Sequence, residues 1–396
     1  MNLNNPIYLI VSYIFIFTFP GLFILNYFDP NNEFFFYAFG SLTDFNVNNF
    51  YSNIFFGLIP ILLFLVIFFR IPAQSFKNQD IDLTNARFIY FNFIAALILI
   101  NLYFFISFNY SIPIVSIAGL VTNESYSMLR ASLSLNNGIF NVGLYFFGFG
   151  SVISGLILSK RSYLYYIFSL FFCAILLLFN MQKSPFIDFI FLCSIGYLFL
   201  KNKSINLLFI APIVLTLIYS VVSFYNPGYE ISRLLQFIFQ RIFFGEISDL
   251  PLYYSLFKND PISFYSVLPP YINNFLGFNF QAASKIVALN VVGYDNLISV
   301  GYFNTIFLGE AYAVFGSFGA FYAQIIIILN FIFLGLLINK TPKNIFTIIL
   351  ISYIIFKYTK GIFAGVGPFI FSTNQIFMLI LAFYLIVKKN LPKMST

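Results

Sequence analysis

SFYNPGYEISRLLQFIFQRIFFGEISDLPLYYSLFKND, residues 223–260, begins the one long polar stretch of this chain, which extends from Val222 to Ser317. The stretch carries Arg, Lys, Asp and Glu together with many aromatic residues, and it is too polar to be buried in lipid. On both sides the sequence consists of apolar runs, each close to the ~20 residues that an α-helix needs to cross a bilayer. The pattern therefore predicts a membrane protein with many spans and one large loop.

The composition agrees with this class. The 396 residues are 60% hydrophobic and 8% charged, whereas about 25% of the residues of soluble domains are charged. A water-soluble fold is therefore excluded. The chain has no histidine, which removes an imidazole base and a His-ligated metal from consideration. Cys173 and Cys193 lie in apolar runs, where a cysteine ordinarily serves as a small hydrophobic residue.

The apolar runs predict an all-α integral membrane protein, a single polytopic domain over residues 1–396 with about ten transmembrane helices. The expected spans are residues 6–28, 52–69, 88–108, 139–159, 162–181, 185–200, 204–224, 317–338, 345–364 and 367–387. The predicted large loop, residues 225–316, lies between the seventh and eighth spans.

The basic residues predict the orientation. With a cytoplasmic N-terminus, the short inner loops hold 12 of the 20 basic residues, as the positive-inside rule requires. These residues are Arg70, Lys77, Arg87, Lys160, Arg161, Lys201, Lys203, Lys340, Lys343, Lys388, Lys389 and Lys393. Both termini are then cytoplasmic, the large loop is outside, and the protein is expected in the plasma (inner) membrane. The net charge of +7 reflects this orientation, so a nucleic-acid partner is not expected.

Residues 230–244 (EISRLLQFIFQRIFF) predict an amphipathic helix within the outer loop. At 100° per residue, Glu230, Arg233 and Arg241 share one polar arc, and the isoleucine and leucine residues occupy the other side. Such a helix can lie in the outer membrane interface. Each of its two guanidinium groups can donate to two phosphate oxygens at once, which favours a phosphate-binding role. The alternative is an ordinary interfacial helix whose arginine side chains extend toward lipid headgroups.

Other basic residues are expected on the same outer side: Arg130 in the loop between spans three and four, Lys183 before span six, and Lys357 and Lys360 near the end of span nine. Together with the two loop arginines they predict an outward-facing cationic cavity that would suit a pyrophosphate at the membrane surface.

NTIFLGEAYAVFGSFG, Asn304 to Gly319, leads the loop into the eighth span and contains Glu310. A carboxylate near the membrane interface is costly unless it is paired or hydrogen-bonded. Glu310 is therefore expected to be either a catalytic group or one half of a salt bridge that ties the loop to the helix bundle. Gly316 and Gly319 allow a close approach of helices or a kinked entry into the membrane.

This arrangement resembles the oligosaccharide repeat-unit polymerase family, the O-antigen polymerases of bacterial surface polysaccharide assembly. The likeness rests on the many spans, the large outer loop after the seventh, the QKSP turn (Gln182 to Pro185), and a Pro-Pro followed by Leu-Gly in DPISFYSVLPPYINNFLGFNF (residues 260–280). It rests also on the end of the loop, with Asn304, Thr305, Glu310, Tyr312, Phe315, Gly316 and Gly319.

The resemblance implies a glycosyl transfer on the outer face of the plasma membrane that needs no metal or other cofactor. The growing glycan leaves its undecaprenyl pyrophosphate carrier and is joined to a hydroxyl of a newly flipped lipid-linked repeat unit. In that reaction a carboxylate base would accept the hydroxyl proton, with Glu310 as the first choice and Asp249 as the second. The pyrophosphate would be bound by Arg130, Arg233, Arg241, Lys183 and Lys360. The implied partners are undecaprenyl pyrophosphate-linked oligosaccharides, the lipid bilayer, a chain-length regulator and a flippase.

Two alternatives stay open. A flippase or transporter for lipid-linked oligosaccharide is also a many-span protein with a cationic cavity, although flippases tend to lack one dominant outer loop. An O-antigen ligase catalyses a similar glycosyl transfer, but those ligases are expected to carry a histidine in the outer loop, and this chain has none.

Overall fold

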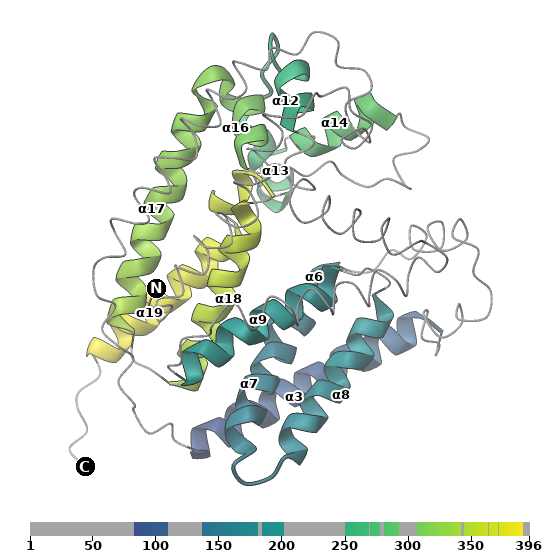
Figure 1. The fold of residues 1–396 in the computed structure, drawn as a ribbon, viewed down its shortest axis with the longest axis vertical. Helices are drawn as coiled ribbons and strands as arrows, with labels where there is room; N and C mark the ends of the chain where they lie inside the picture. Colours follow the sequence, from purple (N-terminus) through teal and green to yellow (C-terminus); the bar gives the residue numbers. More distant parts are fainter. Residues whose placement is uncertain are drawn as a thin grey trace, which may run out of the picture. The chain divides into compact units, whose positions relative to one another are not determined.

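The structure is a computed structural model, and it describes residues 83–109, 137–180, 184–201, 250–268, 270–277, 281–292, 307–341, 344–362, 364–370 and 372–390. Over these residues every secondary-structure element is a helix (Figure 1). Four helical stretches among them are long and apolar enough to cross a membrane: residues 83–107, 138–158, 307–338 and 345–362. The chain is therefore a helical membrane protein.

Helices occupy most of the predicted span positions that are described. Their bounds are α3 (Leu83–Ser107), α6 (Asn137–Val142), the π-helix η2 (Gly143–Gly148), α7 (Phe149–Leu158), α8 (Leu164–Phe179), α9 (Ser184–Lys201), α17 (Gly319–Lys340), α18 (Ile345–Ile362) and α19 (Thr373–Asn390). The predicted spans at 6–28, 52–69 and 204–224 lie outside the described residues.

The predicted span at 367–387 begins later than expected. Its helix, α19, starts at Thr373, and residues 364–370 form a turn that contains the short 3-10 helix η5 (Gly367–Phe369). Two residues explain the difference: Gly365 has φ +127°, outside the helical region, and Pro368 can occupy only the first turn of a helix.

The described residues divide between two compact units. The second unit holds α3 to α9 and α18 as far as Phe356, and its centre is α7, whose residues are almost all buried. Small residues allow this packing, as is common between membrane helices. A Cβ atom on Gly150 would lie 2.0 Å from the ring of Phe93, and one on Gly155 would lie 2.9 Å from the carbonyl oxygen of Tyr165.

Among the described helices of this unit, α9 carries one acid, Asp188. Tyr145, in the π-helical turn η2, donates a hydrogen bond to Asp188 of α9 over 3.2 Å, which reduces the cost of a carboxylate at this depth. The thiols of Cys173 and Cys193, on α8 and α9, are both free.

The first unit holds the described parts of the predicted loop, together with α17, α19 and α18 from Lys357 onward. The loop segments are α12 (Leu250–Leu256), the 3-10 helix η3 (Phe264–Val267), α13 (Pro270–Phe275), α14 (Ala283–Val292), α16 (Phe307–Phe315) and the 3-10 turn η4 (Gly316–Phe318). α17 alone has 22 residues, enough to span a bilayer, so α16 acts as a separate element that leads into it.

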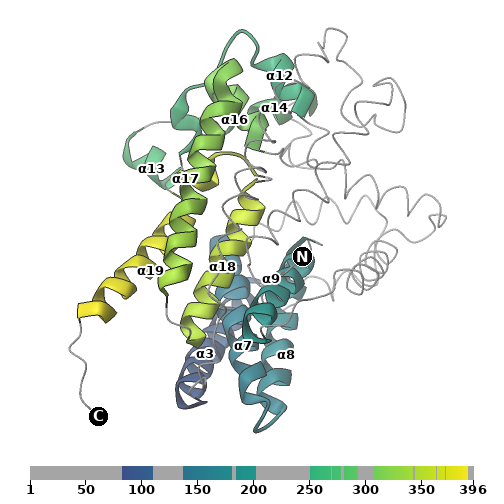
Figure 2. The ribbon, with the colours of Figure 1, turned by 60° about the vertical axis from the view of Figure 1, so that its left-hand side comes forward.

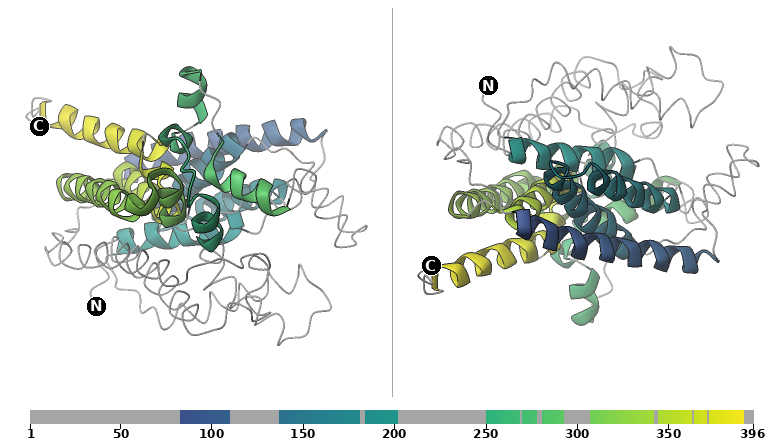
Figure 3. Two further views of the ribbon diagram at one scale, coloured as in Figure 1. Left: turned by 90° about the horizontal axis from the view of Figure 1, so that it is seen from above. Right: turned by 90° about the horizontal axis from the view of Figure 1, so that it is seen from below.

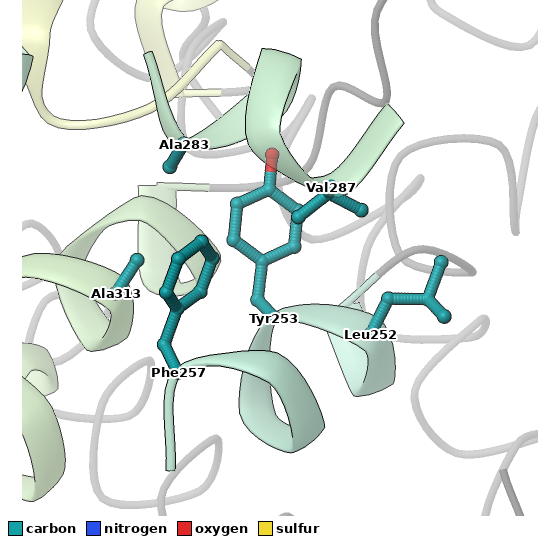
Figure 4. Packing of buried hydrophobic residues seen from close by; sticks show 6 residues of the cluster. All are labelled: Leu252, Tyr253, Phe257, Ala283, Val287 and Ala313. Atoms are coloured by element: carbon teal, nitrogen blue, oxygen red, sulfur yellow. The ribbon is translucent and has the colours of Figure 1, made fainter. Parts of the chain in front are cut away.

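α12, α14 and α16 share a small hydrophobic core (Figure 4). Tyr253 of α12 and Phe257, directly after that helix, pack with Val287 of α14 and Ala313 of α16, and all four side chains are buried. This core fixes α16, and with it Glu310, against the other loop helices.

Candidate functional site

Glu310 lies on α16, and Figure 1 shows α16 between the other loop helices and α17. The helix is held on its loop side by a backbone hydrogen bond of 2.8 Å from Ile262 N–H to the carbonyl oxygen of Ala313. Tyr312 stacks on Tyr254 of α12 with ring centroids 4.1 Å apart. Burial raises the pKa of the Tyr254 hydroxyl above its ordinary value, and the nearby Tyr312 raises it further, so Tyr254 stays neutral at physiological pH.

Gly316 and Gly319 set the angle between α16 and α17. Gly316 has φ +62°, a left-handed conformation that ends α16. A Cβ atom on Gly319 would lie 2.2 Å from the carbonyl oxygen of Ala311 and 2.8 Å from the backbone nitrogen of Tyr312. The close approach predicted for these glycines is present at Gly319, and the kinked entry into the membrane stays a prediction.

We expect Gly319→Ala to lower the free energy of unfolding by about 1–3 kcal/mol, since the added methyl group meets backbone atoms that cannot rotate away. The measurement is the temperature at which detergent-solubilised protein loses its monodisperse peak. Gly316→Asn is the control, because nothing lies within 4 Å of that position and asparagine tolerates a positive φ. Equal stability of Gly319→Ala and wild type would contradict the close approach.

The Glu310 carboxylate binds the connection between α18 and α19. Its Oε2 atom accepts a hydrogen bond from the backbone N–H of Val366 and another, of 2.9 Å, from the N–H of Gly367. Charge-assisted hydrogen bonds of this kind are stronger than neutral ones. The sequence suggested a salt bridge as one possible interaction of Glu310. Among the described residues, its hydrogen-bond partners are two backbone amides. Oε1 accepts no hydrogen bond from the described part of the chain.

Two glycines make this contact possible. At Gly365, φ is +127°, and a Cβ atom would lie 2.2 Å from Oε2 of Glu310. At Gly367, a Cβ atom would lie 2.8 Å from the carbonyl oxygen of Val267 in η3. Three segments far apart in sequence, α16, η3 and the α18–α19 connection, therefore meet at the Glu310 carboxylate.

A network of neutral polar side chains holds the other side of the same connection. Asn330 of α17 donates a hydrogen bond of 3.1 Å to the carbonyl oxygen of Phe369, and Gln375 of α19 donates one of 3.2 Å to that of Pro368. Tyr358 of α18 donates to Asn330 over 2.8 Å. These residues were missed by the sequence analysis, although polar side chains inside apolar runs are a usable signal, since they need partners within the membrane.

The other predicted site residues divide into two groups. Lys360 lies on the last turn of α18 and is exposed, five residues before Gly365 in the chain. Asp249, Arg130, Arg233, Arg241 and Lys183, with the amphipathic helix at 230–244, lie outside the described residues. The cationic cavity therefore stays a prediction.

The geometry around Glu310 suits a carboxylate that acts on a hydroxyl group. One carboxylate oxygen is fixed by two amides, which sets the direction of the other, and an oriented carboxylate can accept a proton from a hydroxyl group or hold that hydroxyl in position.

Comparison of the chain with protein families, with curated proteins and with solved structures finds no match.

Proposed function

We propose that this protein polymerises undecaprenyl pyrophosphate-linked oligosaccharide repeat units into O-antigen or a related surface polysaccharide. The proposed setting is the outer face of the plasma (inner) membrane, with about ten spans, both termini in the cytoplasm and the loop of residues 225–316 outside. The enzyme would be a glycosyltransferase that uses a polyprenyl pyrophosphate-linked donor.

The observation that carries this proposal is the fixed orientation of Glu310 by Val366 and Gly367. A carboxylate between loop helices and a membrane span suits a reaction whose substrates have a lipid tail in the bilayer and a glycan in water. The motif residues Tyr312 and Phe315 support the same assignment, because they pack on Tyr254 and Phe264 of the loop.

In the proposed step, the acceptor hydroxyl oxygen attacks the anomeric carbon of the donor glycan. The bond between that carbon and the pyrophosphate oxygen breaks, and undecaprenyl pyrophosphate leaves with the bonding electrons. Glu310 takes the proton of the hydroxyl group, or Asp249 does so as the second choice. The proposed role of Arg130, Arg233, Arg241, Lys183 and Lys360 is to stabilise the negative charge that develops on the pyrophosphate.

Deletion of the gene tests the proposal. Without a polymerase, single repeat units should still reach the surface acceptor, whereas the ladder of longer chains should vanish from a gel of the surface glycan. Complete loss of glycan from the outer face would instead indicate a flippase. Polymer that accumulates on the lipid carrier and is missing from the surface acceptor would indicate a ligase.

A further inference from the structure

Residues 261–284, between Asp260 and Lys285, contain no charged side chain. The described residues among them lie outside the four helical stretches that can cross a membrane, and the sequence of the segment contains Pro269, Pro270 and Gly277. Segments of a loop that faces water are ordinarily polar. The segment, which includes η3 and α13, mixes apolar and aromatic side chains with uncharged polar ones such as Ser263, Asn273 and Asn274, a composition that suits a membrane interface.

The segment presents large apolar side chains on the protein surface. Phe275 is 89% exposed and Leu276 is 46% exposed, at the end of α13, which projects from the other loop helices in Figures 2 and 3. Phe264 and Tyr265 of η3 are also exposed. Contiguous apolar surface of this kind marks a site of interaction with another molecule or with a membrane.

This surface is continuous with the lipid-facing side of a span. The ring of Phe264 lies 5.9 Å from that of Phe315, which lies 5.5 Å from Tyr322 in the first turn of α17. From there the exposed side chains of α17 follow one helix face: Phe321, Ile325, Leu329, Phe333 and Leu336. Their spacing of three and four residues is that of a single apolar stripe, and in a membrane span such a stripe faces lipid.

α13 is attached firmly to this surface. Asn273 donates hydrogen bonds of 2.9 and 3.2 Å to the carbonyl oxygens of Tyr265 and Leu268, so α13 and η3 move together. Polar residues lie just outside: Lys258, Asn259 and Asp260 are all exposed. The boundary between charged and uncharged surface thus falls between Asp260 and Phe264.

We propose that η3 and α13, with Leu276, insert into the interfacial region of the bilayer, with Phe275 and Leu276 among the lipid chains beside the start of α17. The bilayer is the occupant that fits, because the surface joins the face that α17 presents to lipid. Tyrosine is enriched at that depth, and Tyr265 is among the exposed residues of the segment. This inference does not depend on the proposed reaction. It bears on the site nonetheless, since Val267 of the same segment packs against Gly367, next to Glu310.

The chain contains no tryptophan, so Phe275→Trp provides a single fluorescent reporter in the full-length protein. We expect its emission in phosphatidylcholine vesicles to lie at short wavelength. Vesicles made with phosphatidylcholine brominated near the headgroup end of the acyl chains should reduce the emission strongly. Bromine near the methyl end should reduce it less, since interfacial residues lie at shallow depth. Phe264→Trp provides a second, independent reporter.

Two matched variants calibrate the measurement. Leu329→Trp lies on the lipid face in the middle of α17. Its fluorescence should be quenched most by bromine near the methyl end of the acyl chains. Asn259→Trp lies on the charged side of the boundary and should emit at long wavelength. Aqueous iodide should quench this emission, whereas brominated lipid should leave it unchanged. If Phe275→Trp and Phe264→Trp behave like Asn259→Trp, the inference is wrong. Short-wavelength emission from both without an effect of brominated lipid would also overturn it, because a protein contact would then cover the surface.

Discussion

Glu310→Gln should reduce the rate of polymer formation by roughly 10²- to 10⁴-fold, which is the usual contribution of a positioned general base. Glutamine has nearly the same shape as glutamate, and its side-chain oxygen can still accept the hydrogen bonds from Val366 and Gly367. The variant should therefore be present in the membrane at the wild-type level. Gel analysis of surface glycan should show one or very few repeat units in place of the full ladder.

Glu310→Ala separates the chemical role from the structural one. Alanine removes the acceptor of two backbone N–H groups, and an unsatisfied buried donor costs about 1–3 kcal/mol. This variant should lose polymer and also lower the amount of folded protein. A wild-type ladder from Glu310→Gln, together with a loss of folded protein in Glu310→Ala, would limit Glu310 to a structural role. Asp249→Asn would then be the next variant to assay.

The fold class could be predicted because it depends on composition and on the length of apolar runs, which the sequence displays directly. Helices α3 and α18, and the helical stretch at residues 138–158, lie within a few residues of the predicted spans at 88–108, 345–364 and 139–159. The start of α19 was misplaced because the apolar run continues through Phe369 and Ile370, while the local backbone is decided by Gly365 and Pro368.

The candidate site was predicted only in part. Glu310 was found from its sequence because an acid near a membrane interface is conspicuous. Its partners could not be found, since they are backbone amides of Val366 and Gly367, more than fifty residues away, and any residue except proline supplies an amide. Asn330 and Gln375 were overlooked for a related reason: each is a neutral side chain in a mostly apolar helix, and its partners lie on other helices and on the α18–α19 connection.

Gly365→Ala should destabilise the protein more than a glycine-to-alanine change at any other described glycine near the site. A non-glycine residue in such a backbone conformation costs about 1–3 kcal/mol, and the methyl group would meet Oε2 of Glu310 at 2.2 Å. If the carboxylate moves away, the amides of Val366 and Gly367 lose their acceptor, at about 1–3 kcal/mol more. We expect a total loss of about 2–6 kcal/mol, seen as a lower unfolding temperature in detergent.

Two comparisons isolate the contact with Glu310. Gly277→Ala places a methyl group at φ +72° with nothing within 4 Å, so it should show only the backbone cost. The double variant carries Gly365→Ala together with Glu310→Ala, so the carboxylate that would collide with the new methyl group is absent. Its loss in the free energy of unfolding should be smaller than the sum of the losses of the two single variants, because the effects of residues in contact are not additive. Strictly additive losses would contradict a direct contact. In that case the cost at Gly365 would come from backbone strain alone, and the fixed orientation of Glu310 would lose its main structural support.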